Sequence, residues 1–281
     1  MILLTSVCND RYLPGLLVFL HSFKKHHPTW DHPFKIYHRD DLSENSKNKL
    51  NVVYPKLMFE HITDSKFNGK DAHYMCLLPF KECGYDQVIF LDCDMLCLGP
   101  IDEILNVKKG FAACLDYEFC FPKKIIHSTP LPFRPLSYFN TGVFSVKKPL
   151  LNETTYNKLV SVIDQNVLHK RKKLWDQDII NEQLRFSDTS ILPFTLNARK
   201  NLFKTYFNPA SRNVKIIHYT GGAKPWYVPG CGFLPLEGKY ARYKPLHELW
   251  QQERQSFIKQ YGFDPMQNFI NHYQGTQAEN I

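Results

Sequence analysis

A chain of 281 residues with 43% hydrophobic and 22% charged residues has the composition of a folded globular protein, long enough for one large domain or two small ones. No apolar run reaches the roughly 18–20 residues of a membrane-spanning helix, and the opening MILLTSVCNDRY lacks the basic head of a secretory signal. The formal charge of +8 favours anionic partners, but no helix-turn-helix, zinc or aromatic RNA-binding signature accompanies it, so we expect no nucleic-acid partner.

The eight cysteines show no paired metal-ligand spacing. Cys93, Cys97 and Cys114 lie in apolar segments, where a reduced thiol behaves as a small hydrophobic group. We therefore expect reduced cysteines and a cytoplasmic location.

Short apolar strands and amphipathic helices alternate over the first 83 residues. Pro14 opens the first helix, whose Leu16, Leu17, Leu20 and Phe23 share one face. Such alternation is typical of a largely parallel sheet with helical crossovers. The expected elements are a strand at 2–7, a helix ending near 26–28, a strand at 34–37, a helix at 44–53, a strand at 56–61 and a helix at 72–83.

The next strand leads into VIFLDCDMLCL at 88–98, the most informative segment. Side chains two apart in an extended chain point the same way, so Asp92 and Asp94 can present their carboxylates side by side where a buried strand ends. Such charges repel unless a cation lies between them, and hard oxygen ligands suit Mg²⁺ or Mn²⁺. A merely acidic loop is the alternative, because an isolated Asp-x-Asp is common.

Further elements follow this segment. Strands are expected at 111–115 and 141–146, and helices at 155–167 and 176–186. The proline-rich stretch at 122–135 is expected to form a flexible loop over the site.

The last 40 residues, from about Lys239, place apolar residues among many polar ones, and no repeat or linker divides the chain. This pattern predicts amphipathic helices that pack on the domain or rest on a membrane. The apolar positions are Leu246, Leu249, Trp250, Phe257 and Ile258.

A second ligand-rich segment, KIIHYTGGAKPWYV at 215–228, also follows a short apolar strand. His218 ends the strand, Gly221 lets the backbone come close to a ligand, and Lys224 offers a point charge suited to phosphate. Each has a simpler reading, because a histidine at a strand end is often only hydrogen-bonded and paired glycines often only make a turn. Together with the two aspartates, these residues predict a cradle for a divalent metal that holds a diphosphate.

Five segments now carry a family resemblance. They are CNDRYLPG at 8–15, DCD at 92–94, FNTGVF at 139–144, WDQDIINEQL at 175–184 and HYTGGAKPW at 218–226. With them, the chain resembles glycosyltransferase family 8 over roughly residues 1–230, the group that includes glycogenin and bacterial lipopolysaccharide galactosyltransferases. The resemblance implies a single α/β domain of the GT-A (Rossmann-like) fold with a mostly parallel central sheet, which we place at 1–238. The apolar pattern after it predicts a C-terminal helical extension at 239–281.

The resemblance also implies an activity. A hexose, glucose or galactose, would pass from a UDP-sugar to a hydroxyl of a glycan, glycolipid or protein, with metal dependence and retained anomeric configuration. The implied metal ligands for Mn²⁺ or Mg²⁺ are Asp92, Asp94 (the DXD motif) and His218. The implied substrate-binding residues are Asn9 and Tyr12 at the uracil, Lys224 at the diphosphate with Gly221 as the glycine of close approach, and Asp116 and Asn140 around the donor sugar. Asp92, Cys93 and Thr141 are further implied substrate-binding residues.

Asp176 and Gln177 are the implied catalytic pair at the sugar. An amide is a poor nucleophile, so Gln177 favours front-face attack by the acceptor hydroxyl, while Asp176 keeps a double displacement open. Simpler readings are a turn residue for Asn140 and a helix N-cap for Asp176. Bacterial members commonly carry an arginine before the Asp-x-Asp strand, and the matching place here is Cys76, which leaves the donor sugar open.

Other functions remain open at this point. The HKRKK cluster at 169–173 indicates an anionic acceptor or peripheral contact with an anionic membrane, or else a solvated loop. The nucleotide-sugar pocket could also serve a self-glycosylating or a non-catalytic UDP-sugar-binding protein. A nucleotidyltransferase would require a glycine- and arginine-rich loop after the first strand, and CNDRYLPG offers none.

Overall fold

The computed structural model describes residues 1–67, 69–116, 138–164, 176–184, 187–203, 209, 213–267 and 269–270. The proline-rich stretch at 122–135 and the basic cluster at 169–173 lie outside these residues, as do the last positions of the helices expected at 155–167 and 176–186. The predictions made for them stay predictions.

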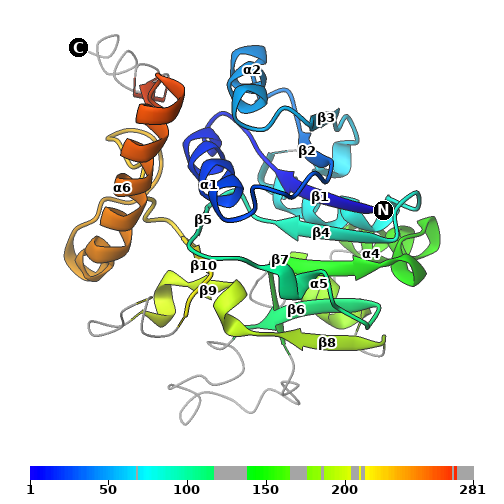
Figure 1. Ribbon diagram of the computed structural model, residues 1–281. Helices are drawn as coiled ribbons and strands as arrows, with labels where there is room; N and C mark the ends of the chain where they lie inside the picture. Colours follow the sequence, from blue (N-terminus) through cyan, green and yellow to red (C-terminus); the bar gives the residue numbers. More distant parts are fainter. Residues whose placement is uncertain are drawn as a thin grey trace.

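A seven-stranded sheet forms the centre of the fold, in the order β3-β2-β1-β4-β7-β6-β8 (Figure 1). Neighbouring strands are parallel except at β7, which runs antiparallel to both β4 and β6. The expected α/β architecture with a mostly parallel sheet is confirmed, and β8 is an addition to it. The strands are β1 (Ile2–Val7), β2 (Phe34–His38), β3 (Leu57–His61), β4 (Gln87–Leu91), β6 (Phe111–Leu115), β7 (Phe139–Lys147) and β8 (Thr189–Leu192).

Helices cover both faces of this sheet, which is why β4 is buried throughout. One face packs against α1 (Leu13–His26) and α2 (Glu44–Val53), where Leu4 and Ile89 join the helices' apolar side chains. Val88 and Phe90 point to the other face. There they meet the 3-10 helix η2 (Gly69–Lys81), α4 (Glu153–Asp164) and α5 (Asp176–Gln183).

The helix expected at 72–83 differs in type from the prediction, because η2 is a 3-10 helix. Residues 74–80 are all buried, so the segment is enclosed on every side rather than amphipathic. Pro79 within it lacks the N–H that an α-helix would use.

A second, three-stranded sheet has the order β5-β10-β9, with β5 (Met95–Cys97), β10 (Ile216–His218) and β9 (Ala198–Arg199). The C-terminal helix α6 (Lys244–Tyr261) packs on it and beside α1 (Figure 1). Trp250 of α6 is fully buried, with its ring centroid 5.7 Å from that of Trp226. The expected C-terminal helix is thus present, while the division at residue 238 stays a prediction.

Shorter 3-10 helices complete the described chain. They are η1 (Ser65–Phe67), η3 (Asp102–Ile104), η4 (Lys148–Leu150), η6 (Phe194–Leu196), η7 (Lys200–Leu202) and η9 (Gly238–Tyr243).

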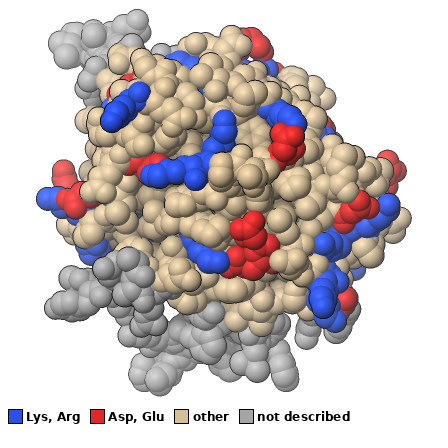
Figure 2. Space-filling view, viewed as in Figure 1, with Lys and Arg blue, Asp and Glu red and all other residues tan. Residues whose placement is uncertain are grey.

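Basic and acidic side chains are interspersed on the face shown in Figure 2, and no single basic patch covers it. Among the helices of the described chain, none combines the length and the apolar composition needed to cross a bilayer.

Candidate active site

Strand direction brings the candidate residues to one edge of the central sheet. Asp92 follows the carboxyl end of β4, and its backbone N–H donates to the carbonyl of Gly142 at 2.9 Å. Because β7 runs antiparallel to β4, the amino-terminal part of β7, with Asn140 and Thr141, lies at the same edge. β7 therefore brings its amino-terminal residues to the edge of the sheet at which the parallel strands have their carboxyl ends.

The small sheet adds the histidine. β10 pairs antiparallel with β5, and the register places His218 opposite Met95, next to Asp94. The backbone N–H of Tyr219 donates to the carbonyl oxygen of Asp94 at 2.8 Å. Residues more than a hundred positions apart thus meet through two adjacent strands.

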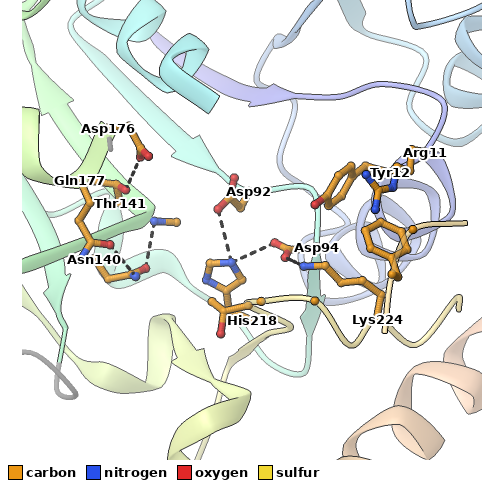
Figure 3. A pocket seen from close by; sticks show the side chains of 16 residues that line it. Arg11, Tyr12, Asp92, Asp94, Asn140, Thr141, Asp176, Gln177, His218 and Lys224 are labelled. Atoms are coloured by element: carbon orange, nitrogen blue, oxygen red, sulfur yellow. Dashed lines mark hydrogen bonds and ion pairs between the residues drawn. The ribbon is translucent and has the colours of Figure 1, made fainter. Parts of the chain in front are cut away.

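Asp92, Asp94 and His218 form a compact group whose ligand atoms all lie within 4.8 Å of one another. Nε2 of His218 lies 2.9 Å from Oδ1 of Asp94 and 3.4 Å from Oδ2 of Asp92 (Figure 3). Two carboxylate oxygens and an imidazole nitrogen suit Mn²⁺ or Mg²⁺, with the remaining positions open to ligand oxygens. The three residues therefore fit a divalent cation.

The protonation of this group supports the same conclusion. Burial lowers the pKa of His218, but Asp94 and Asp92 outweigh it and raise the pKa to about 9. Burial raises the pKa of Asp94, yet Lys224 and His218 hold it well below its usual range. The imidazolium thus lies where two carboxylates require positive charge, and a bound cation would replace its Nε2 proton.

Lys224 reaches the group from the loop after β10. Its ammonium pairs with Asp94 and donates to the carbonyl of Tyr219 at 2.7 Å. Gly221 in the same loop has φ +75°, a conformation that favours glycine, and a Cβ there would meet nothing within 4 Å. The loop therefore presents open backbone and a fixed cation to the cavity.

Tyr12 and the aromatic rings around it form one wall of the cavity, on the same side of the metal group as Lys224 (Figure 3), whose ammonium nitrogen is 5.4 Å from the centre of the Tyr12 ring. The ring of Tyr12 meets Trp226 and Phe233 edge-on, with centroids 6.2 Å and 5.3 Å apart. Oδ1 of Asn9 accepts from the backbone N–H of Tyr12 at 3.1 Å, and its Nδ2 donates to Asp41 at 3.0 Å. Both predicted nucleotide residues are therefore held in fixed orientations at the carboxyl end of β1.

The predicted sugar residues lie on the other side of the metal group (Figure 3). Nδ2 of Asn140 donates to Oε1 of Gln177 at 3.0 Å, and Thr141 donates to Oδ2 of Asp176 at 2.8 Å. Nε2 of Gln177 donates in turn to Asp116 at 2.9 Å. These five side chains come from β7, from the start of α5 and from the position that follows β6.

Two adjoining cavities, of about 410 and 260 Å³, contain most of these residues. Tyr12, Asp92, Asp94, Thr141 and Asp176 line both of them. The larger also contains Asn140, Gln177, His218, Gly221 and Lys224, and the smaller Asn9 and Cys93. Asp116 lines neither cavity, because it is fully buried behind Gln177 and paired with Arg199.

Cys76 lies in the smaller cavity, and its thiol donates to Oδ2 of Asp176 at 3.2 Å. Burial and the charge of Asp176 raise the pKa of this thiol well above its usual value. A neutral thiol thus stands beside Asp176, at the place where the family resemblance indicates an arginine in bacterial members.

Several residues that shape the site were missed by sequence reasoning. Arg11, stacked at 4.1 Å over the ring of Phe233, lines the larger cavity with it, and Asp41 lines the smaller. Asn197 and Arg199 lie behind the cavity and contact His218 and Asp116. Arg11 stands inside the CNDRYLPG motif, so its neighbours could have drawn attention to it, whereas residues 197–199 carry no comparable signal.

Comparison with protein families gives one extended match. The model named Glycosyl transferase family 8 matches residues 3–228. That range contains every candidate site residue.

Curated relatives agree with this match. Glycogenin-1 of Mus musculus is 26% identical over 242 residues, which cover 79% of this chain and 64% of that protein. Lipopolysaccharide 1,3-galactosyltransferase of Salmonella typhimurium is 28% identical over 156 residues, 52% of this chain and 46% of that protein. The chain thus spans less than two thirds of the length of these relatives.

Among solved structures, galactosyltransferase LgtC in complex with donor and acceptor sugar analogs superimposes with a TM-score of 0.63 at 19% identity, covering 90% of this chain and all of that one. The glycosyltransferase GlyE of Streptococcus pneumoniae gives a TM-score of 0.60 at 20% identity, covering 90% of this chain and 60% of that one. These similarities confirm the expected GT-A fold.

Proposed function

This chain belongs to glycosyltransferase family 8, and from that premise we propose that it transfers a hexose, glucose or galactose, from a UDP-sugar to a hydroxyl of a glycan, glycolipid or protein acceptor. The observation that carries the proposal is the convergence of Asp92, Asp94, His218 and Lys224 in one cavity between an aromatic wall and a polar one. A divalent cation, Mn²⁺ or Mg²⁺, bound by the first three would neutralise charge on the departing diphosphate.

We place the donor between the aromatic wall at Tyr12 and the polar wall formed by Asp176 and Gln177. Tyr12 offers its ring to the uracil, with Asn9 beside it, and Lys224 with the open backbone at Gly221 receives the diphosphate. The sugar then extends toward Asp176 and Gln177. In this proposal the diphosphate lies at Asp92, Asp94 and His218, and the bond that breaks, between sugar and phosphate, lies on the side of Asp176 and Gln177.

The chemistry that these residues support is front-face transfer with retained configuration. A bond forms between the acceptor oxygen and the anomeric carbon while the bond from that carbon to the phosphate oxygen breaks. The acceptor's proton passes to the leaving phosphate, and UDP departs. Gln177 supplies only amide dipoles, and the oxygen Oδ2 of Asp176 already accepts from Thr141 and Cys76, so neither is arranged as a free nucleophile.

We also propose a cellular location for the enzyme. Cysteines in the described residues are free, among them the buried Cys8, Cys76 and Cys93 around the smaller cavity. Free thiols at a substrate cavity favour a reducing, cytoplasmic location. Peripheral contact with an anionic membrane through 169–173 stays a prediction.

The test is UDP release from a panel of UDP-sugars with Mn²⁺, with and without candidate acceptors. Turnover of UDP-glucose or UDP-galactose that EDTA stops would support the proposal. Intact mass spectrometry of the protein in the same reactions separates transfer to an added acceptor from self-glycosylation. Binding of UDP-sugar without release of UDP under any condition would contradict an enzymatic role.

A further inference from the structure

A continuous chain of hydrogen bonds links Asp116 to the candidate metal ligand His218. Gln177 donates to Asp116, Asn140 donates to Gln177, and Asn197 donates to Oδ1 of Asn140 at 2.7 Å. Oδ1 of Asn197 then lies 2.8 Å from Nδ1 of His218. All five side chains are buried, and Asn140, Gln177 and His218 each also reach the larger cavity.

Asp116, at one end of this chain, determines which group donates and which accepts in each hydrogen bond. Asp116, bound by the guanidinium of Arg199, is a carboxylate and can only accept. Gln177 must therefore turn its NH₂ group toward Asp116 and its oxygen toward Asn140. Asn140 must donate to that oxygen and offer its own oxygen to Asn197.

A backbone group fixes the same direction independently. The N–H of Gly142, which can only donate, points at Oδ1 of Asn140 at 3.1 Å. With the oxygen of Asn140 so placed, Asn197 must turn its NH₂ group to it and its own oxygen to His218. Nδ1 of His218 must then carry a hydrogen, which leaves Nε2 as the nitrogen that faces Asp92 and Asp94.

We propose that Asn197 is a positioning residue with two partners: it holds His218 in the tautomer that directs Nε2 to the metal, and it holds the amide of Asn140 that orients Gln177 at the sugar. The inference rests on the proposed function, because it assigns this role at the same site. Hydrogen bonds behind metal-bound histidines typically contribute 10–100-fold to metal affinity.

The fold explains why Asn197 can do this. It lies between η6 and β9, and β9 pairs with β10 so that Ala198 and Arg199 stand opposite Ile217 and His218. Asn197 therefore contacts the His218 end of the hydrogen-bond chain, while Arg199, two residues on, contacts its Asp116 end. A single tripeptide supports both ends.

Two substitutions separate the two partners. Asn197→Leu removes both hydrogen bonds, so Mn²⁺ affinity should fall 10–100-fold and turnover should fall with it. Asn197→Asp keeps an oxygen for Nδ1 of His218 but gives Asn140 an acceptor in place of a donor. Its Mn²⁺ affinity should stay within about threefold of the wild type, whereas kcat should fall at least tenfold, because Gln177 loses its orientation.

A matched control lies four residues away. Asn201 accepts from the hydroxyl of Tyr243 and lines neither cavity. Asn201→Asp preserves that acceptor and should leave both Mn²⁺ affinity and kcat unchanged.

Mn²⁺ affinity is read from the electron paramagnetic resonance signal of free Mn²⁺ during titration of each protein, independently of activity. Thermal unfolding checks that each variant folds, and Asn197→Asp, the isosteric change, keeps the test decisive if Asn197→Leu does not fold. Wild-type affinity in Asn197→Leu, or equal losses of affinity in both variants, would overturn the inference alone. A wild-type chain that binds no Mn²⁺ would overturn the proposed metal site as well, so the two failures are distinguishable.

Discussion

Gly142 lies directly against the ring of His218: a Cβ atom at position 142 would come within 2.3 Å of Cε1 and 2.6 Å of Nδ1. Gly142→Ala must therefore displace the imidazole or the amino-terminal end of β7. Overpacking of this kind typically costs about 1–3 kcal/mol, and here the strain falls on a metal ligand. We expect Mn²⁺ affinity to fall at least tenfold in the titration described above.

Gly84→Ala is the matched control for this substitution. Apart from its own chain neighbours, no residue comes within 4 Å of a Cβ built there, and its φ is not in the left-handed region. It should leave Mn²⁺ affinity unchanged. Equal affinities in the two variants would show that His218 can move without loss of the metal site.

The two aspartates should respond differently to loss of charge. Asp94 is buried with Lys224 and His218, so Asp94→Asn leaves a buried ammonium without its carboxylate, a change that typically costs about 3–5 kcal/mol of stability. Asp92, whose side chain is 37% exposed, does not pair with Lys224. Asp92→Asn should abolish Mn²⁺-dependent turnover with little change in the midpoint of thermal unfolding, whereas Asp94→Asn should lower both.

Asp31→Asn, at an exposed aspartate in an ion pair with Lys56, is the control for both variants. It should match the wild type in turnover and in thermal midpoint. Full activity of the wild type in EDTA would contradict the metal requirement itself.

Tyr12 tests the nucleotide wall. Loss of an aromatic stacking partner typically costs roughly 1–3 kcal/mol per base, so Tyr12→Ala should weaken UDP binding about 5–150-fold by calorimetry. Tyr12→Phe keeps the ring between Trp226 and Phe233 and should bind UDP nearly as well as the parent. If Tyr12→Ala binds UDP like the wild type, the uracil lies elsewhere.

Gln177 tests the transfer step. If its amide only stabilises positive charge on the sugar, Gln177→Ala should slow turnover about 10–10³-fold without eliminating it. Asp176→Asn should slow turnover more than Gln177→Ala does, because it removes a full negative charge and also alters the hydrogen bond that Asp176 accepts from Thr141. The anomeric proton coupling of the product, measured by NMR, decides the stereochemistry: a β-linked product from an α-linked UDP-sugar would contradict retention.

His247 on α6 provides a pH test. Burial, with Lys200 and Lys224 nearby, lowers its pKa to about 3, so the folded protein keeps it neutral below the usual value near 6.5. Between these values the unfolded chain binds a proton that the folded chain does not. The free energy of unfolding therefore falls as the pH falls from 6.5 toward 3, by up to about 1.4 kcal/mol per pH unit from this group.

His247→Leu should flatten that dependence. Urea unfolding of both proteins at pH 7, 6 and 5 measures it, and the stability of the variant relative to the wild type should rise at each step down. A constant difference across the three values would show that His247 does not remain neutral in the folded protein.

Local patterns predicted the parts of the site that lie within one segment. The run of β-formers before Asp92 fixed both a strand and the side of the chain that its carboxylates share. The open glycine turn before Lys224 followed from residue types alone. Local patterns do not reveal the direction of a strand or the neighbour with which it pairs. The antiparallel direction of β7, which depends on its neighbours in the sheet, determines where Asn140 and Thr141 lie.

Asn197 and Arg199 show the same limit more sharply. Neither belongs to a motif with a recognisable spacing, and each has its role only because β9 pairs with β10. The 3-10 helix η2 is similar, since an enclosed segment has no amphipathic period to reveal its type. Residues that act through tertiary neighbours are thus the ones that the chain alone does not identify.

The ion pair between Asp94 and Lys224 joins residues 130 positions apart, and this separation sets when the site can exist during synthesis. At roughly 5–20 residues per second, about 6–26 s pass between translation of the two residues. For most of that interval Asp92 and Asp94 stand without Asn197 and His218, and Lys224 is added only at its end. A divalent ion that requires all of these ligands would therefore bind only after the three-stranded sheet β5-β10-β9 has formed. By mass action, its binding would then stabilise the folded chain relative to the partly synthesised chains that lack this sheet.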